Sequence, residues 1–138
     1  MTTSMTPQAV PYLLSNLYMR RENIANLLLR LGVAFAFLYP AIAEIYTPDS
    51  WIGYFPHMVR GFVPDLVLLH SFGAVEAIIA LWILSNKKIF LPSLAATAIL
   101  LAIVYFDFNQ LEVVFRDVAI AGASASLMIS NMGRKRRI

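Results

Sequence analysis

The sequence predicts an all-α integral membrane protein, a four-helix bundle with an interfacial segment between the first and second helices. Two observations predict this fold class. Of the 138 residues, 59% are hydrophobic and 14% are charged, whereas soluble domains average roughly 45–50% apolar and 25% charged residues. The apolar residues also gather into four long runs, and the charges lie mainly at the ends of these runs. A bilayer accounts for both observations, because lipid covers apolar surface that a chain of this length cannot bury.

Each apolar run is close to the length of about 20 residues that a transmembrane helix needs. The runs cover residues 24–46, 64–85, 88–106 and 113–132. In the first run, Pro40 removes the hydrogen bond to the Ala36 carbonyl, which predicts a kink. The predicted division of the chain is a cytoplasmic lead or surface helix (1–23), a transmembrane domain (24–132) and a basic cytoplasmic tail (133–138).

The connections between the runs differ in character. Residues 86–88 alone link the second and third runs, so these helices are predicted to form an antiparallel pair with a tight turn. Residues 47–63 are too short and too broken to span a bilayer, yet they include Trp51, Phe55 and Phe62. Aromatic residues of this kind favour the headgroup level of a membrane. We therefore expect a short amphipathic or re-entrant segment there.

The basic residues distinguish the two sides of the predicted bundle. Those on one side are Arg20, Arg21, Lys87, Lys88, Arg134, Lys135, Arg136 and Arg137, and those on the other are Arg60 and Arg116. The positive-inside rule then places both termini in the cytoplasm, in a multi-pass protein of the cytoplasmic (inner) membrane. Basic residues beside apolar runs indicate membrane lipid as the partner and argue against nucleic acid. The absence of cysteine excludes disulfides and thiolate metal sites within the chain.

Ionisable residues inside the predicted spans are the first candidates for a functional site. Each one costs roughly 2.5–3.5 kcal/mol on insertion scales and therefore needs a partner, water or a function. Arg30 and Glu76 are the deepest, and the length of the arginine side chain predicts a buried ion pair between them. The alternative is that Arg30 extends to the inner headgroups while Glu76 is a neutral packing residue.

A second polar cluster is predicted at the outer mouth of the bundle. Its candidate members are Glu44, Asp65, His70, Arg116 and Asp117. Glu44 projects within about 40° of Arg30 on the first span. Asp65 projects within about 20° of Glu76 on the second, so both spans turn a polar stripe inward.

Two of these candidates carry specific predictions. Arg116 is predicted to pair inward with Glu44 and Asp65, the alternative being that it caps its span at the headgroups. His70 is predicted to donate to a nearby carbonyl or carboxylate, rather than to ligate a metal or haem.

Small residues recur every four positions on three of the spans. They are Gly32, Ala36 and Pro40, then Gly73 and Ala77, and finally Gly122, Ser126 and Ser130. Such stripes allow helix backbones to approach closely in lipid. We therefore expect close helix contacts along them.

Four short motifs accompany this pattern. They are Arg30-Leu31-Gly32, the segment around Trp51, Phe72-Gly73-Ala74-Val75-Glu76 and Phe115-Arg116-Asp117-Val118-Ala119. Over residues 24–131, the chain thereby resembles the DoxX/DoxD-like family of small bacterial and archaeal membrane proteins. The resemblance implies a redox-linked membrane subunit, because named members resemble a membrane subunit of thiosulfate:quinone oxidoreductase. Glu44 stands near the position where many members carry a lysine, so the role of that lysine does not transfer.

Three functions are compatible with these observations. The first is a membrane subunit of a redox-linked complex that contacts a quinone, with an oxidoreductase as its partner protein and no cofactor held by the chain itself. The second is a small transporter or a proton or solute carrier, which with four spans calls for a homo-oligomer to form a pore. The third is a structural membrane scaffold whose polar residues join helices. The family resemblance favours the first.

Overall fold

The computed structural model describes residues 9–133, apart from the side chains of residues 110, 111 and 113, and over this range the chain is helical with no strand. The elements are α1 (Ala9–Tyr46), α2 (Pro48–Ile52), α3 (Asp65–Leu84), α4 (Phe90–Phe106), the 3-10 helix η1 (Phe108–Gln110) and α5 (Leu111–Ser130). The predicted all-α class is confirmed. The four long helices α1, α3, α4 and α5 correspond to the four apolar runs.

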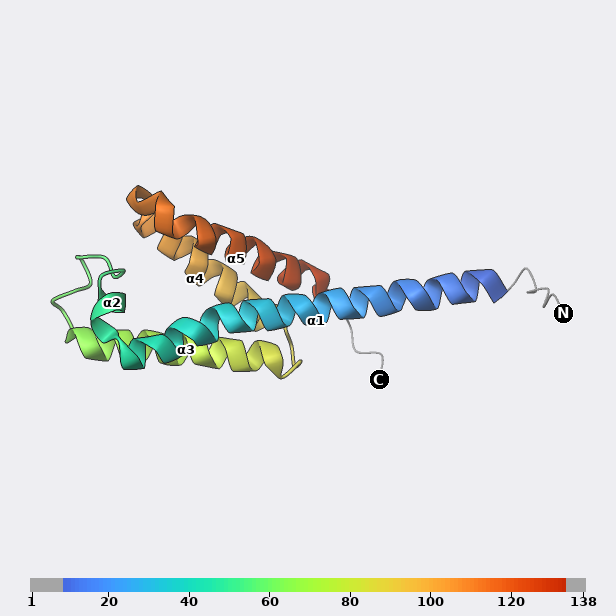
Figure 1. The fold of residues 1–138 in the computed structure, drawn as a ribbon, viewed down its shortest axis with the longest axis horizontal. Helices are drawn as coiled ribbons and strands as arrows, with labels where there is room; N and C mark the ends of the chain where they lie inside the picture. The colour runs from blue at the N-terminus through green and yellow to red at the C-terminus, as the bar shows by residue number, and fades with distance from the viewer. Residues whose placement is uncertain (1–8, 134–138) are drawn as a thin grey trace.

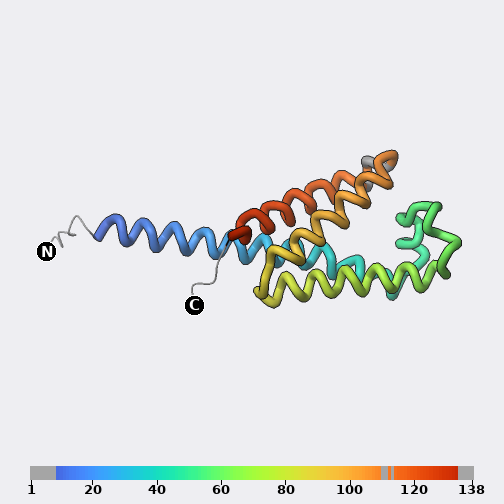
Figure 2. Tube along the Cα trace, turned by 180° about the vertical axis from the view of Figure 1, so that it is seen from behind, coloured from blue at the N-terminus to red at the C-terminus, as the bar shows by residue number. Residues whose placement is uncertain are grey.

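The long helices form two pairs. α1 packs along α3, and α4 packs along α5, while α1 also meets α5 and α3 also meets α4. Successive long helices run in opposite directions (Figure 1). Both views show that the two pairs lie together near the α3–α4 turn and separate towards the end that carries α2 (Figure 2). The bundle is therefore closed at one end and open at the other.

Apolar side chains fill the closed part of the bundle. Val33 and Phe37 of α1, Ile83 of α3, Ala96 of α4 and Leu127 of α5 are all buried in one cluster. A polar contact also joins the second pair, where the hydroxyl oxygens of Thr97 and Ser124 lie 2.8 Å apart. Apolar packing thus holds the helices at one end and leaves the other end free to hold polar groups.

The turn between α3 and α4 is as tight as predicted. Asn86 and Lys88 adopt φ angles of 60° and 46°, in the left-handed region. Asparagine accepts this conformation more readily than most residues, whereas a lysine there is strained. The indole N–H of Trp82 donates to the Lys87 carbonyl at 2.9 Å and fixes the turn against α3.

α1 is longer than the predicted first span. It has 38 residues, which corresponds to a length of about 57 Å, and it continues without a break from the segment predicted as a lead or surface helix. Arg20, Arg21 and Glu22 end the apolar run but are good helix formers, so the helix does not end with it. The N-terminal part of α1 extends beyond the bundle (Figure 1). Residues 1–8 of the predicted lead and 134–138 of the predicted tail lie outside the described residues.

The segment between α1 and α3 is a short helix followed by turns. α2 begins at Pro48, a favourable residue for a first turn. After Ile52 the chain turns repeatedly, with one isolated bridge between Arg60 and Val63. α2 packs against α1 and α3 at the open end of the bundle (Figure 1).

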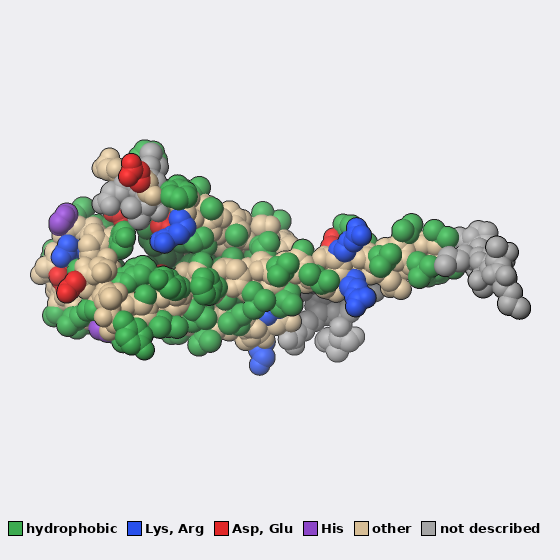
Figure 3. All heavy atoms as spheres, viewed as in Figure 1, with side chains coloured by type: hydrophobic (Ala, Val, Ile, Leu, Met, Phe, Trp, Pro, Cys, Tyr) green, Lys and Arg blue, Asp and Glu red, His purple; other side chains and the backbone are tan. Residues whose placement is uncertain are grey.

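Two helices, α1 and α3, are long and apolar enough to cross a membrane. Within their most apolar stretches, only 28% of α1 and 33% of α3 is buried inside the protein. α4 is apolar but has 17 residues, and α5 carries three charged residues, Glu112, Arg116 and Asp117, near its start. Hydrophobic side chains cover much of the visible outer face of the bundle (Figure 3).

The predicted small-residue stripes have unequal outcomes. A Cβ added to Gly32 or Gly122 would meet no atom within 4 Å, so these two glycines allow no close contact between helices of the described chain. Gly73 is different, because a side chain from α1 lies directly against it. The stripe prediction is therefore wrong for Gly32 and Gly122, whereas Gly73 makes room for a polar group at the open end of the bundle.

Candidate functional site

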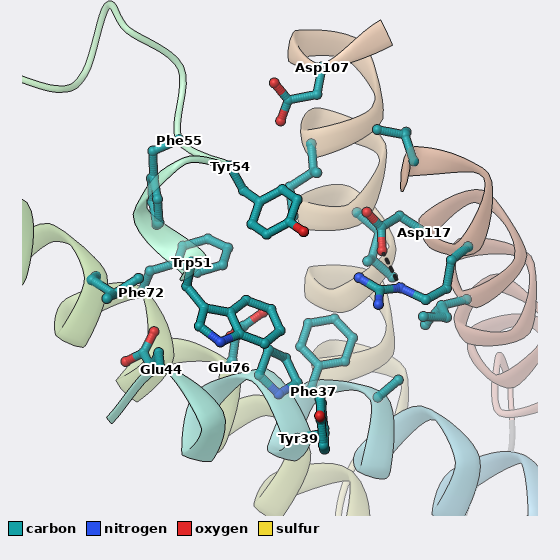
Figure 4. A pocket seen from close by; sticks show the side chains of 18 of the residues that line it. Phe37, Tyr39, Glu44, Trp51, Tyr54, Phe55, Phe72, Glu76, Asp107 and Asp117 are labelled. Carbon is teal, nitrogen blue, oxygen red and sulfur yellow. Dashed lines mark ion pairs between the residues drawn. The ribbon is translucent and has the colours of Figure 1, made fainter. Parts of the chain in front are cut away.

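A cavity of about 340 Å³ lies between the two helix pairs at the open end of the bundle. All four long helices line it, together with Trp51, Tyr54 and Phe55 from the segment between α1 and α3 (Figure 4). Its charged lining residues are Glu44, Glu76, Asp107, Arg116 and Asp117. Figure 4 shows Glu44 and Glu76 on one wall and Asp107 and Asp117 on the other. Acidic groups outnumber basic groups four to one, so the cavity favours positive charge.

Four of the seven predicted polar-core residues meet at this cavity. They are Glu44, Glu76, Arg116 and Asp117, whereas Arg30, Asp65 and His70 do not line it. The inward polar stripe on the second span is therefore carried by Glu76 and not by Asp65, which is exposed at the start of α3.

Among the described residues, Glu76 is buried without a hydrogen-bond donor or a cation beside its carboxylate. It is 8% exposed, and among the described side chains no donor or cation pairs with its carboxylate. The groups that act on its charge are the carboxylates of Glu44 and Asp117, which repel a negative charge at this position. A buried charge without a partner is strongly disfavoured. Binding a proton or a cation would therefore stabilise this carboxylate.

Glu44 reaches from α1 to the backbone of α3. It is 4% exposed, and a Cβ on Gly73 would lie 2.9 Å from its Oε2 and closer still to its Oε1. Only a glycine leaves room for the carboxylate at this point. The imidazole of His70, when protonated, attracts the carboxylate of Glu44. The Nδ1–H of His70 donates to the Leu66 carbonyl at 2.7 Å, so the predicted hydrogen bond of this histidine to a carbonyl is confirmed.

Arg116 pairs with its own neighbour and not with other helices. Its Nε lies 3.6 Å from Oδ1 of Asp117, and the two side chains are 59% and 14% exposed, respectively. Asp65 instead contacts Arg60 at 3.4 Å. The predicted pairing of Arg116 with Glu44 and Asp65 is therefore wrong. Both observed pairs join residues close in sequence, which form contacts without bringing distant helices together.

Arg30 caps a helix and does not pair with Glu76. Its Nε donates to the Ile83 carbonyl at 3.1 Å, and its Nη2 donates to the Leu84 carbonyl at 2.8 Å. The last carbonyls of a helix lack intrahelical donors and carry partial negative charge, so a guanidinium is a suitable partner. The predicted Arg30–Glu76 ion pair is wrong for this reason: the end of α3 satisfies the arginine before it can reach the glutamate.

Aromatic rings form the wall of the cavity towards α2. The ring of Trp51 lies 6.4 Å from that of Tyr39 and 5.9 Å from that of Tyr54, centroid to centroid. Phe55 meets Phe72 of α3 edge to face at 5.4 Å. In Figure 4 the rings of Trp51 and Tyr54 lie between the two acidic walls. The segment predicted to rest at the membrane surface thus also lines the cavity.

The lining residues that sequence reasoning did not assign to the site include Tyr39, Tyr54, Phe72 and Asp107. The aromatic content of residues 47–63 was a usable signal, since rings that anchor a segment at a headgroup layer also present faces to the helices beneath it. Asp107 gave no signal beyond its acidic type at the outer end. Whether Asp107 lines the cavity depends on how far the two helix pairs separate. The periodicity of residues along a single helix carries no information about that separation.

Pro40 also affects the backbone beside the cavity. Pro40 has no N–H, so it cannot donate to the Ala36 carbonyl, and both residues line the cavity. By contrast, no three acidic or histidine side chains within the described chain lie close enough together to hold a metal ion. Figure 4 shows the acidic groups on two walls of the cavity. Such a site can hold a ligand of several atoms or exchange protons.

No known protein family, curated protein or solved structure matches this chain. The DoxX/DoxD-like resemblance, drawn from short motifs, therefore stays a prediction.

Proposed function

We propose that this chain is a four-span protein of the cytoplasmic membrane, with both termini in the cytoplasm, that binds a proton or a small cation in the cavity and carries it. The bundle supports the first part of this proposal. The apolar stretches of α1 and α3 are mostly unburied, which suits lipid contact better than the core of a soluble protein. The apolar α4 and the small-residue-rich α5 pack together as a second hairpin of similar length.

The burial of Glu76 without a partner carries the second part. A scaffold needs no unpaired carboxylate in its interior, because a glutamine or an apolar residue would pack at lower cost. Ionisable residues at membrane depth that face a cavity mark proton or ion paths. Glu44, Asp107 and Asp117 increase the negative potential of the same cavity.

The test is proton or cation movement across a membrane by purified protein in liposomes. We expect a pH-sensitive dye trapped inside the vesicles to report Glu76-dependent uptake after an imposed pH step. Glu76→Gln should abolish the uptake. Glu112→Gln makes the same chemical change at an exposed residue that does not line the cavity, so it should leave the uptake intact. Equal fluxes in empty vesicles and in vesicles with wild-type protein would refute the carrier proposal.

The orientation is tested separately by cysteine labelling, which is direct because the chain has no native cysteine. Phe62→Cys introduces a thiol in the exposed segment at the open end of the bundle, and Lys88→Cys introduces one at the closed end. We expect a membrane-impermeant maleimide to label position 62 from outside intact cells and to label position 88 only after lysis. The reverse pattern would overturn the proposed topology.

A second candidate is the redox-linked, quinone-contacting subunit. The observation that favours it is the wall of Tyr39, Trp51 and Tyr54, because aromatic faces also stack on a planar quinone head group. This function predicts that a water-soluble quinone analogue binds in the cavity and that the protein purifies with an oxidoreductase. Binding of the analogue that is insensitive to Trp51→Leu would exclude the cavity as a quinone site.

A further inference from the structure

The carboxylates and the rings together define a more specific ligand. Resting on the proposed function, we infer that the cavity takes an organic ammonium ion that carries apolar substituents. The carboxylates of Glu44 and Glu76 supply the opposite charge, and Trp51 with its neighbouring tyrosines supplies faces for the cation and its substituents.

The arrangement of the acidic groups disfavours a bare metal ion. A divalent cation needs several oxygen ligands within one coordination sphere of about 2.0–2.6 Å radius. Within the described chain, the acidic side chains do not gather in this way. Glu44 and Glu76 stand on one wall of the cavity, and Asp107 and Asp117 stand on the other (Figure 4). A ligand that engages both walls must therefore have a body of several atoms.

The aromatic wall indicates what kind of body this is. A cation within about 6 Å of a ring centroid is attracted to the ring face, and the attraction grows when water is excluded. Tyr39, Trp51 and Tyr54 place three consecutive rings at one side of the cavity, within reach of the same volume that Glu76 faces. Alkyl or aryl groups on the nitrogen would be covered by the same rings and by Leu100.

The volume agrees with this ligand class. Sites for small organic molecules have volumes of about 300–1,000 Å³, and this cavity has about 340 Å³. It is therefore at the small end of the range, which suits a compact amine or quaternary ammonium ion.

The experiment measures the binding of benzyltrimethylammonium to the full chain in detergent, by calorimetry and by tryptophan fluorescence. The chain has two tryptophans, of which Trp51 lines the cavity and Trp82 lies at the α3–α4 turn. We expect saturable binding that weakens at least about tenfold in Glu76→Gln. We also expect a loss of about threefold to tenfold in Trp51→Leu, with partial retention in Trp51→Phe, which keeps a ring.

Matched controls separate these effects from misfolding. Glu112→Gln and Tyr105→Leu change the same residue types at exposed positions outside the cavity and should bind like wild type. Benzenesulfonate has a similar ring with the opposite charge and should not bind. Fluorescence of Trp51 should change on binding, and the change should persist in Trp82→Phe.

The outcomes distinguish the two proposals. If the probe does not bind while Glu76-dependent proton uptake persists, the ammonium inference fails and the proposed function stands. If the probe binds equally to wild type, Glu76→Gln and Trp51→Leu, it does not occupy the cavity and the inference also fails. If neither uptake nor binding occurs, both proposals fail. Binding that requires both Glu76 and a ring at position 51 supports the inference.

Discussion

The carboxylate of Glu44 occupies the space beside Gly73 that a side chain at position 73 would need. This contact joins α1 to α3 at the level of the cavity, because Glu44 lines the cavity and Gly73 is one helical turn from Glu76. The glycine therefore determines where a buried carboxylate lies. Small residues in membrane helices usually allow two backbones to approach, and here one instead allows a charged side chain to lie against a backbone.

We predict that Gly73→Ala does not give the stabilisation that replacing glycine by alanine usually gives in a helix. Gly122→Ala, where the new Cβ meets no atom, should stabilise the protein by about 0.5–1 kcal/mol. Gly73→Ala should instead be neutral or destabilising, because the new Cβ displaces Glu44. Unfolding in mixed micelles measures both changes.

A double variant provides the control for this prediction. Glu44→Ala in the Gly73→Ala background removes the clash, so the two changes should be coupled by about 0.5–3 kcal/mol. Simple additivity would show that Glu44 does not lie against Gly73.

We predict that Arg30→Leu destabilises the protein by about 1.5–3 kcal/mol, because the end of α3 loses two charge-assisted hydrogen bonds. Arg30→Lys should recover part of this loss, since lysine keeps the charge but not the planar pair of donors. The effects of Arg30→Leu and Glu76→Gln on unfolding should add within about 0.5 kcal/mol, as for residues that do not touch. A larger coupling would restore the ion pair that the sequence suggested.

The helices were predictable because long apolar runs of this length are typical of helices. The predicted spans 64–85 and 88–106 differ little from α3 (Asp65–Leu84) and α4 (Phe90–Phe106). The start of α1 was not predictable in this way, because hydropathy reports where an apolar run ends and not where helical hydrogen bonding ends. Arg20 and Arg21 interrupt the apolar run, but they continue the helix because arginine is a good helix former.

The candidate site was predictable in composition but not in pairing. Glu44 and Glu76 were correctly assigned to inward faces, because helical periodicity fixes direction around one helix. Partners depend instead on depth and on competing groups. Arg30 donates to the carbonyls of Ile83 and Leu84, which are backbone groups and not charged side chains. Arg116 found Asp117, the nearest acid in the chain.

We predict that Arg116→Leu has a small effect on stability, below about 1 kcal/mol, because the Arg116 side chain is 59% exposed and solvent weakens its ion pair with the more buried Asp117. Asp117→Asn, and not Glu44→Gln, should compensate whatever loss occurs, because Asp117 is the observed partner. The measurement is the folded yield in membranes of the single and double variants. Selective rescue by Glu44→Gln would contradict the Arg116–Asp117 pair and would indicate that Arg116 pairs with Glu44 across the cavity.

We predict that the buried carboxylate of Glu76 lowers the stability of the fold. A carboxylate that is buried, unpaired and close to two other acidic groups weakens the fold, so Glu76→Gln should stabilise the protein by about 1–3 kcal/mol while abolishing uptake and cation binding. The change keeps the size and shape of the side chain, so packing contributes little to the difference. Glu112→Gln is the matched control and should change stability by less than about 0.5 kcal/mol, as expected for an exposed site. Unfolding in mixed micelles and dye uptake in liposomes, measured on the same preparations, give both quantities. A Glu76→Gln protein that is less stable than wild type would mean that the carboxylate is held by favourable contacts, and the site would then be structural.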